Sequence, residues 1–113
     1  MQLLTLVLNK VEVLEELLAE LARSGIKGAT ILDSTGMATA LLNSDEELPF
    51  FGALGKVLNP DREESKTILM VLRDEQIETA KQVIQAVTGG IEKPNTGILF
   101  GVPINFVEGT VEE

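Results

Sequence analysis

The first half of the chain alternates between short apolar runs and one amphipathic stretch. Residues 3–8 (Leu-Leu-Thr-Leu-Val-Leu) form an apolar run of the length of a strand. In the segment 13–22, leucines recur at helical spacing with glutamates on the opposite side, which predicts an amphipathic helix. Gly25 follows the last of these leucines and is predicted to end the helix in a left-handed conformation. The leucines of this stripe are Leu14, Leu17, Leu18 and Leu21. A strand is predicted at 29–35, so the predicted order of this half is strand, helix, strand.

The second half repeats this order. Residues 67–72 form another apolar run, and Asp74 is a suitable N-cap for a helix after it. The apolar stripe of that helix is Ile77, Ala80, Ile84 and Val87. Thr88-Gly89-Gly90 ends the helix, and residues 97–102 supply a fourth strand. Pro103 cannot donate to a strand ladder, so a strand that continued through residues 104–107 would be irregular or would lie at an edge.

Two such units in tandem predict one α+β domain over residues 1–113, in the ferredoxin-like βαββαβ order, with a short tail at 108–113. Right-handed crossovers place both helices on one face of an antiparallel sheet. The other face is then bare, although its strands are nearly as apolar as the covered side. Because a large apolar face needs a cover, we expect an oligomer.

The connection between the second and third strands, residues 37–65, is long for such a domain, and long connections tend to be functional or disordered. Ser44 and Glu47 fit a capping box, and Asn59-Pro60 fits the end of a short helix. The apolar side of that helix would be formed by Phe50, Phe51, Leu54, Val57 and Leu58. Two interpretations stay open: these residues dock a partner protein, or they pack back onto their own oligomer.

The residue inventory narrows the possible chemistry. The 113-residue chain has no cysteine and no histidine, which excludes disulfides, thiolate metal sites and Ser–His or Cys–His catalytic pairs. Only carboxylates and lysines remain for acid–base work, so we expect a binding protein and not an enzyme. The run 61–64 (Asp-Arg-Glu-Glu) lacks the spacing of a calcium-binding loop, and no metal site is predicted.

The net charge of −9 disfavours nucleic acid and anionic membranes as partners. Residues 1–8 have no basic segment or small-residue cleavage site beside them, which favours a strand over a signal peptide. No apolar run approaches the roughly eighteen residues of a membrane span. We therefore expect a cytoplasmic protein without direct membrane insertion.

Four segments, in order and spacing, resemble the PII nitrogen-regulatory superfamily of PII and PII-like signalling proteins. They are the opening strand and helix, 3–22; the stretch 25–31 (Gly-Ile-Lys-Gly-Ala-Thr-Ile), similar to the family's Gly-Ile-x-Gly-x-Thr-Val; Gly36, at the entry to the family's long T-loop; and residues 88–97, similar to its B-loop. The resemblance implies a homotrimer whose ligand clefts lie between subunits, where the T-loop base meets the B-loop. It also implies an adenine nucleotide as effector, and a target protein such as a transporter or enzyme.

The ligand-binding residues implied by this resemblance come from the second strand, the T-loop base and the B-loop. They are Thr30, Gly36, Met37, Ala38, Gly89, Gly90, Lys93, Asn95, Thr96 and Gly97. Several also have a plain interpretation: Thr30 is an ordinary strand residue, Gly36 ends a strand, and Gly89-Gly90 ends a helix.

The sequence differs from PII proteins at the positions that contact the phosphates or the ligand in PII. Ala38 and Ala40 replace a glycine and a glutamine, Ile98 replaces the B-loop lysine, and residues 108–110 replace two arginines on the last strand. Because a buried triphosphate needs cations or amides, we do not expect PII-type ATP binding. AMP, ADP, a cyclic nucleotide or no nucleotide fits better.

Two alternatives stay open. The loss of phosphate-binding positions favours a ligand-free interaction module of the same fold. An amino-acid-binding regulatory domain of the ACT type shares the element order, but its ligands usually meet the turn after the first strand. That turn is Asn9-Lys10 here and lacks the expected glycine.

Overall fold

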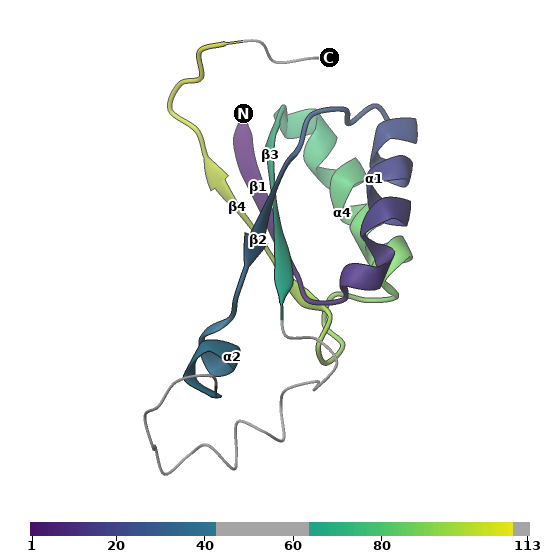
Figure 1. The fold of residues 1–113 in the computed structure, drawn as a ribbon. Coiled ribbons are helices and arrows are strands. Elements are labelled where there is room, and N and C mark those ends of the chain that lie inside the picture. The colour runs from purple at the N-terminus through teal and green to yellow at the C-terminus, as the bar shows by residue number, and fades with distance from the viewer. Residues whose placement is uncertain (43–63, 110–113) are drawn as a thin grey trace.

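The computed structural model describes residues 1–42 and 64–109, which form a four-stranded sheet with two long helices on one side and a short helix beyond the end of one strand (Figure 1). The elements in chain order are β1 (Gln2–Leu8), the 3-10 turn η1 (Val11–Val13), α1 (Leu14–Arg23), β2 (Thr30–Ser34), α2 (Met37–Leu42), β3 (Ser65–Leu72), the 3-10 turn η2 (Asp74–Gln76), α4 (Ile77–Thr88) and β4 (Gly97–Pro103).

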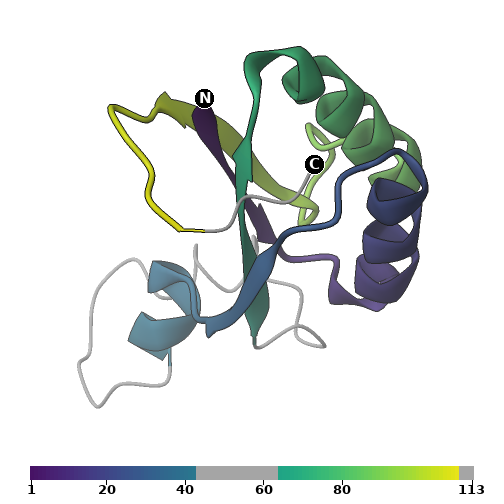
Figure 2. The same ribbon diagram turned by 90° about the horizontal axis from the view of Figure 1, so that it is seen from above.

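The strands lie in the order β2-β3-β1-β4, and every neighbouring pair is antiparallel. Figures 1 and 2 show α1 and α4 side by side over one face of the sheet. The prediction of an α+β domain with an antiparallel sheet is therefore confirmed. Pro103 is the last residue of β4, which is an edge strand of the sheet.

The core lies between the sheet and the two long helices. Alternate residues of β1 and β3 face the helices and are almost fully buried, because successive side chains of a strand point to opposite faces. These strand residues are Leu4, Leu6, Leu8, Ile68, Met70 and Leu72. The helices contribute the buried residues Leu17, Leu21, Ala80 and Ile84, all from the stripes predicted above.

For α4, the predicted C-terminal end is correct and the predicted N-cap is not. Gly89 is left-handed (φ 81°) and its N–H donates to the Gln85 carbonyl at 3.1 Å, which closes α4 as predicted. The predicted N-cap Asp74 is wrong, because Asp74 lies inside η2. Its carboxylate instead pairs with the N-terminal ammonium of Met1 at 3.2 Å.

The long connection begins differently from its prediction. Residues 37–42 form α2 directly after β2, and the N–H of Ala40 donates to the carbonyl of Gly36 at 3.0 Å. Ala, Leu and Met are strong helix formers, which explains this short helix. The predicted capping box, the apolar residues 50–58 and residues 61–63 of the acidic run lie outside the described residues, and Glu64, the last residue of that run, is exposed. Within the described ranges, no helix is long and apolar enough to cross a membrane.

Candidate functional site

A cavity of about 470 Å³ opens where β2 begins. The pairing of β2 with β3 starts at Thr30 and Leu69, and residues 26–29 before it belong to no strand. Thr30 lines the cavity together with the apolar side chains of Leu3, Leu69 and Val71. The register places these four residues on the face of the sheet that carries no helix.

The polar lining of this cavity is nearly balanced in charge. Among the described residues that line it, Lys27 is the one cation and Glu108 the one anion, and Gln76 adds an amide. The Gln76 side-chain oxygen accepts a hydrogen bond from the N–H of Arg73 at 3.0 Å, which fixes its position. Such a lining suits a ligand with a large apolar part and a small charge. Among the ten predicted ligand-binding residues, only Thr30 lines it.

The loop after α4 is held in shape by its own backbone. Four of its residues have positive φ: Gly89, Gly90, Asn95 and Gly97. The N–H groups of Asn9 and Lys10 both donate to the carbonyl of Thr96, at 2.9 and 3.2 Å. These bonds tie the loop to the end of β1.

The amides that a phosphate cradle would need are also occupied. The N–H of Gly89 closes α4, and the N–H of Gly90 donates to the buried hydroxyl of Thr88 at 3.3 Å. That hydroxyl donates in turn to the carbonyl of Ile84 at 2.6 Å. The predicted glycines therefore serve the helix end, which matches their plain interpretation.

Lys10, in the turn after β1, has a role at the end of α4 that the sequence did not indicate. Its ammonium donates to the carbonyl of Thr88 at 3.1 Å, at the C-terminal end of α4. A cation is favourable there because the last carbonyls of a helix carry partial negative charge. A lysine just after a strand gave no signal of this role, since the strand and the helix end are far apart in the chain.

Gly97 has a packing role that needs no ligand. A Cβ atom built at Gly97 would lie 2.4 Å from the carbonyl oxygen of Val7, and the φ of 153° is unfavourable for other residues. Only glycine lets β4 approach β1 this closely.

The other predicted residues of this loop differ in exposure. Lys93 and Asn95 are exposed, whereas Thr96 is buried.

The ten predicted residues fall into two groups on opposite edges of the sheet. Thr30, Gly36, Met37 and Ala38 belong to β2 and the segment after it, and residues 89–97 lead into β4. Two strands, β3 and β1, separate β2 from β4. One chain therefore does not bring the two groups into a single site.

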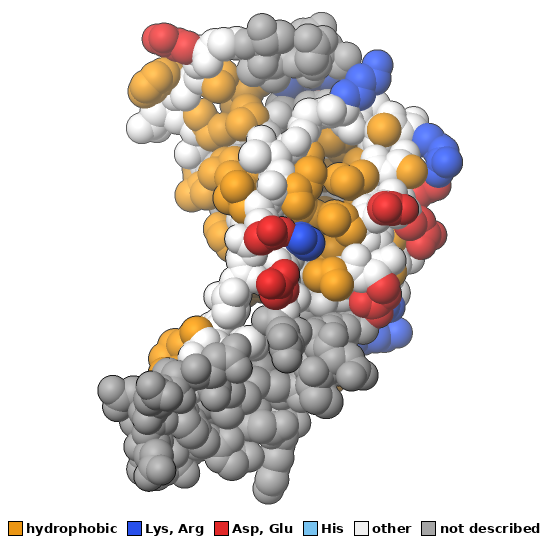
Figure 3. All heavy atoms as spheres, viewed as in Figure 1, with side chains coloured by type: hydrophobic (Ala, Val, Ile, Leu, Met, Phe, Trp, Pro, Cys, Tyr) orange, Lys and Arg blue, Asp and Glu red, His pale blue; other side chains and the backbone are white. Residues whose placement is uncertain are grey.

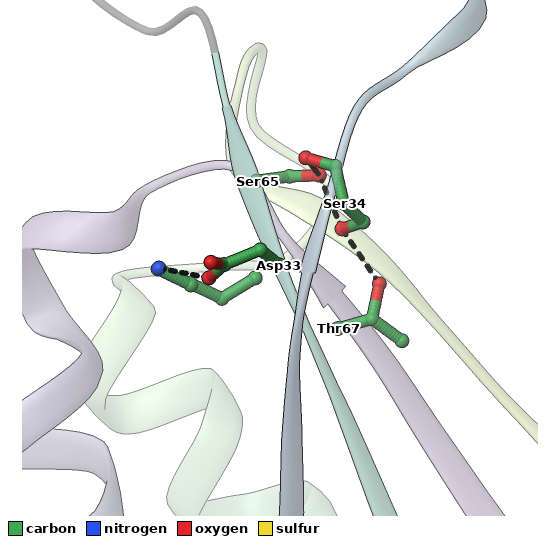
Figure 4. A network of polar contacts seen from close by, with 5 residues as sticks. Asp33, Ser34, Ser65 and Thr67 are labelled. Atoms are coloured by element: carbon green, nitrogen blue, oxygen red, sulfur yellow. Dashed lines mark hydrogen bonds and ion pairs between the residues drawn. The ribbon is translucent and has the colours of Figure 1, made fainter.

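A hydroxyl network joins the two ends of the long connection (Figure 4). The Oγ atoms of Ser34 and Ser65 lie 2.7 Å apart, and the Thr67 hydroxyl donates to Ser34 Oγ at 2.8 Å. On the opposite face of the same strands, the ammonium of Lys66 donates to the Asp33 carboxylate, and this bond raises the pKa of Lys66. Both faces thus hold β2 to β3 where the connection leaves and returns.

The face without helices is largely apolar. Its hydrophobic residues that keep some exposure are Leu3, Val7, Leu32, Leu69, Val71, Ile98, Phe100 and Val102. Along β4, Ile98 is 59% exposed and Phe100 is 48% exposed. Figure 3 shows hydrophobic side chains gathered over β4 and the start of the segment that follows it. We call this surface the open face.

No protein-family model matches the chain, and no curated protein matches its sequence.

Proposed function

We propose that the protein is a PII-like regulator. In this proposal its ferredoxin-like subunits form a cytoplasmic homotrimer that binds a small effector between subunits. The long connection, residues 37–65, then acts on a target protein. The placement of the predicted ligand residues on two opposite edges of one sheet is the observation that carries the proposal. A cleft containing both groups requires a second copy of the chain.

The strand order supports the ferredoxin-like part of the proposal. β1 lies between β3 and β4, so each half of the chain places its two strands apart with a helix crossing between them. This arrangement follows from two right-handed βαβ units with both helices on one face.

The open face supports the assembly. Burial of a Leu, Ile, Val or Phe side chain contributes about 1.5–3 kcal/mol, so covering this face offers on the order of 10 kcal/mol before the cost of association. Three copies with their open faces inward would remove this surface from water. They would also bring the β2 edge of one copy to the β4 edge of its neighbour.

The cavity at Thr30 supports an effector less charged than ATP. Among the described residues of one chain, Lys27 is the one cation that lines this side of the proposed cleft, and it cannot by itself balance the roughly four negative charges of a triphosphate. AMP, ADP or a cyclic nucleotide has fewer charges to offset. An effector that contacts β2 would favour one arrangement of the connection that starts at its end, by shifting populations.

The test combines solution mass with binding. Sedimentation equilibrium should give three times the mass of one chain, and titration calorimetry should give tighter binding for AMP, ADP or cyclic AMP than for ATP. Thr30→Ala should weaken this binding, whereas Thr79→Ala on the exposed side of α4 should not. A folded monomer at micromolar concentration contradicts the assembly, and flat isotherms for all four nucleotides contradict the effector.

A second candidate is a ligand-free interaction module of the same fold. The occupied amides of Gly89 and Gly90 favour it, because they leave a phosphate little to bind. This candidate predicts that Phe51→Ala or Leu54→Ala removes a partner in pulldown while the oligomer persists. Partner binding that survives both substitutions argues against it.

A further inference from the structure

A groove of about 330 Å³ lies between α1 and α4 on their solvent side. Its lining residues keep some exposure, whereas the residues of the same helices that face the sheet, such as Leu17 and Ile84, are fully buried. The two helices run in opposite directions (Figure 1). The groove is therefore an outer surface of the helical layer, separate from the open face and from the cavity at Thr30.

The floor of the groove is apolar and formed by small residues. Val83, Ala86 and Val87 of α4 follow the spacing i, i+3, i+4, so they form one stripe. Val83 and Val87 rest on the core and are partly buried, and Ala86 is exposed. Because Ala86 has only a methyl group, a larger side chain from outside can approach the helix backbone at this point.

The rim of the groove is acidic. Glu16 and Glu20, one turn apart on α1, line one side, and Gln82 lines the other. Arg23 pairs with Glu20, while Glu16 has no ion pair among the described residues. No cation of the described part of the chain lines the groove, and the full sequence carries a net charge of −9.

We infer that this groove docks an amphipathic helix of a partner protein, with Lys or Arg beside its apolar stripe. Two adjacent helices offer a groove into which the side-chain ridges of a third helix fit. The acidic rim selects for cationic flanks, and the net charge speeds the approach of a basic partner. A second copy would bring another acidic helical surface, and nucleic acid or an anionic bilayer would be repelled.

The contact is short, since the lining spans little more than one turn of each helix. Binding should therefore be transient, with a dissociation constant on the order of 10–100 µM that rises with salt.

The test uses a defined peptide and matched variants of the full chain. The probe is a fluorescein-labelled helical peptide with leucines at i, i+4, i+7 and i+11 and lysines on both flanks. A second peptide with glutamates in place of the lysines is the charge control. Fluorescence anisotropy should show saturable binding of the basic peptide only.

Two pairs of variants locate the site. Ala86→Arg and Glu16→Lys change groove residues, and Thr79→Arg and Glu15→Lys introduce the same side chains at exposed positions outside its lining. All four positions are exposed, so the fold should persist, and melting curves check this. The groove variants should weaken binding at least about fivefold, and the controls less than about twofold.

Three outcomes would overturn the inference. The first is no saturable binding of the basic peptide, and the second is equal binding of the acidic one. The third is equal weakening by each groove variant and its control, which would indicate nonspecific charge attraction. Amide shifts on peptide addition provide an independent map: they should centre on residues 16–20 and 82–87, and shifts confined to the open face would contradict the docking site.

Discussion

The two faces of the sheet are made by alternate residues of the same strands, yet they differ in exposure. On β1, Leu6 faces α1 and α4 and is 0% exposed, while Val7, the next residue, faces the open side and is only partly buried. The edge strand β4 shows the same contrast, since Leu99 is partly buried against the core and Phe100 is 48% exposed. Apolar character alone therefore does not produce burial; a covering layer does.

The largest effect on the free energy of unfolding should come from a substitution that creates a cavity in the core beneath the helices. Leu6→Ala removes a fully buried side chain and should lower the free energy of unfolding by about 2–5 kcal/mol, measured by urea titration. Val7→Ala is the matched change on the open face. Its cost should be smaller and should grow with protein concentration, because it acts through association. A cost of Val7→Ala that equals that of Leu6→Ala at every concentration would remove the contrast between the faces.

The next effect concerns the close approach of β4 to β1. Gly97→Ala places a Cβ against the Val7 carbonyl in an unfavourable backbone conformation, and should cost about 2 kcal/mol or more. Gly28→Ala is the control, because its φ is not positive and a Cβ there meets nothing within 4 Å among the described residues. Thermal unfolding of both variants decides the point, and a tolerated Gly97→Ala would contradict this reason for the glycine.

Association should respond to the open face more than folding does. Phe100→Ser should change the stability of one chain by less than about 1 kcal/mol, because the side chain is already half exposed. The same change should lower the molar mass in solution at micromolar concentration, since it removes a large apolar contact. A mass unchanged by this substitution would place the interface elsewhere.

The smallest effect is a dependence on pH at the end of β2. The hydrogen bond from Lys66 to Asp33 raises the lysine pKa above its ordinary value of 10.5. The stabilisation is therefore complete below pH 10.5 and is lost as the pH rises through the raised pKa. Asp33→Asn should lower the melting temperature slightly at pH 8, and the difference from the parent should shrink above pH 10.5. Ser34→Ala, on the other face, should show no such trend.

Much of the fold could be predicted because strands and long helices repeat their apolar residues with periods of two and 3.6. The helices α1 and α4 are 10 and 12 residues long, so each repeats its apolar residues often enough to give that signal. The segment 37–42 is only six residues long and has no stripe, so α2 was missed. The 3-10 turns before α1 and α4 were missed because capping patterns locate a helix start only to within a turn.

The candidate site was less predictable than the fold. The cavity joins the segment before β2 to Val107 and Glu108, which follow β4 and are distant in the chain. No local pattern indicates that these segments meet. The interior hydrogen bonds of Gly90 and the role of Lys10 likewise depend on tertiary contacts. The sequence shows where the glycines are, but it does not show whether their N–H groups are available to bind a ligand.

The hydroxyls of Ser34 and Ser65 have a consequence for protein engineering. They hydrogen-bond to each other and so hold the two ends of the long connection together. The entropic cost of closing a flexible connection between two such ends grows only slowly with its length. A tight turn or a whole fluorescent domain grafted between these serines should therefore leave the rest of the fold intact. The same serines mark where the chain could be opened to make a circular permutant.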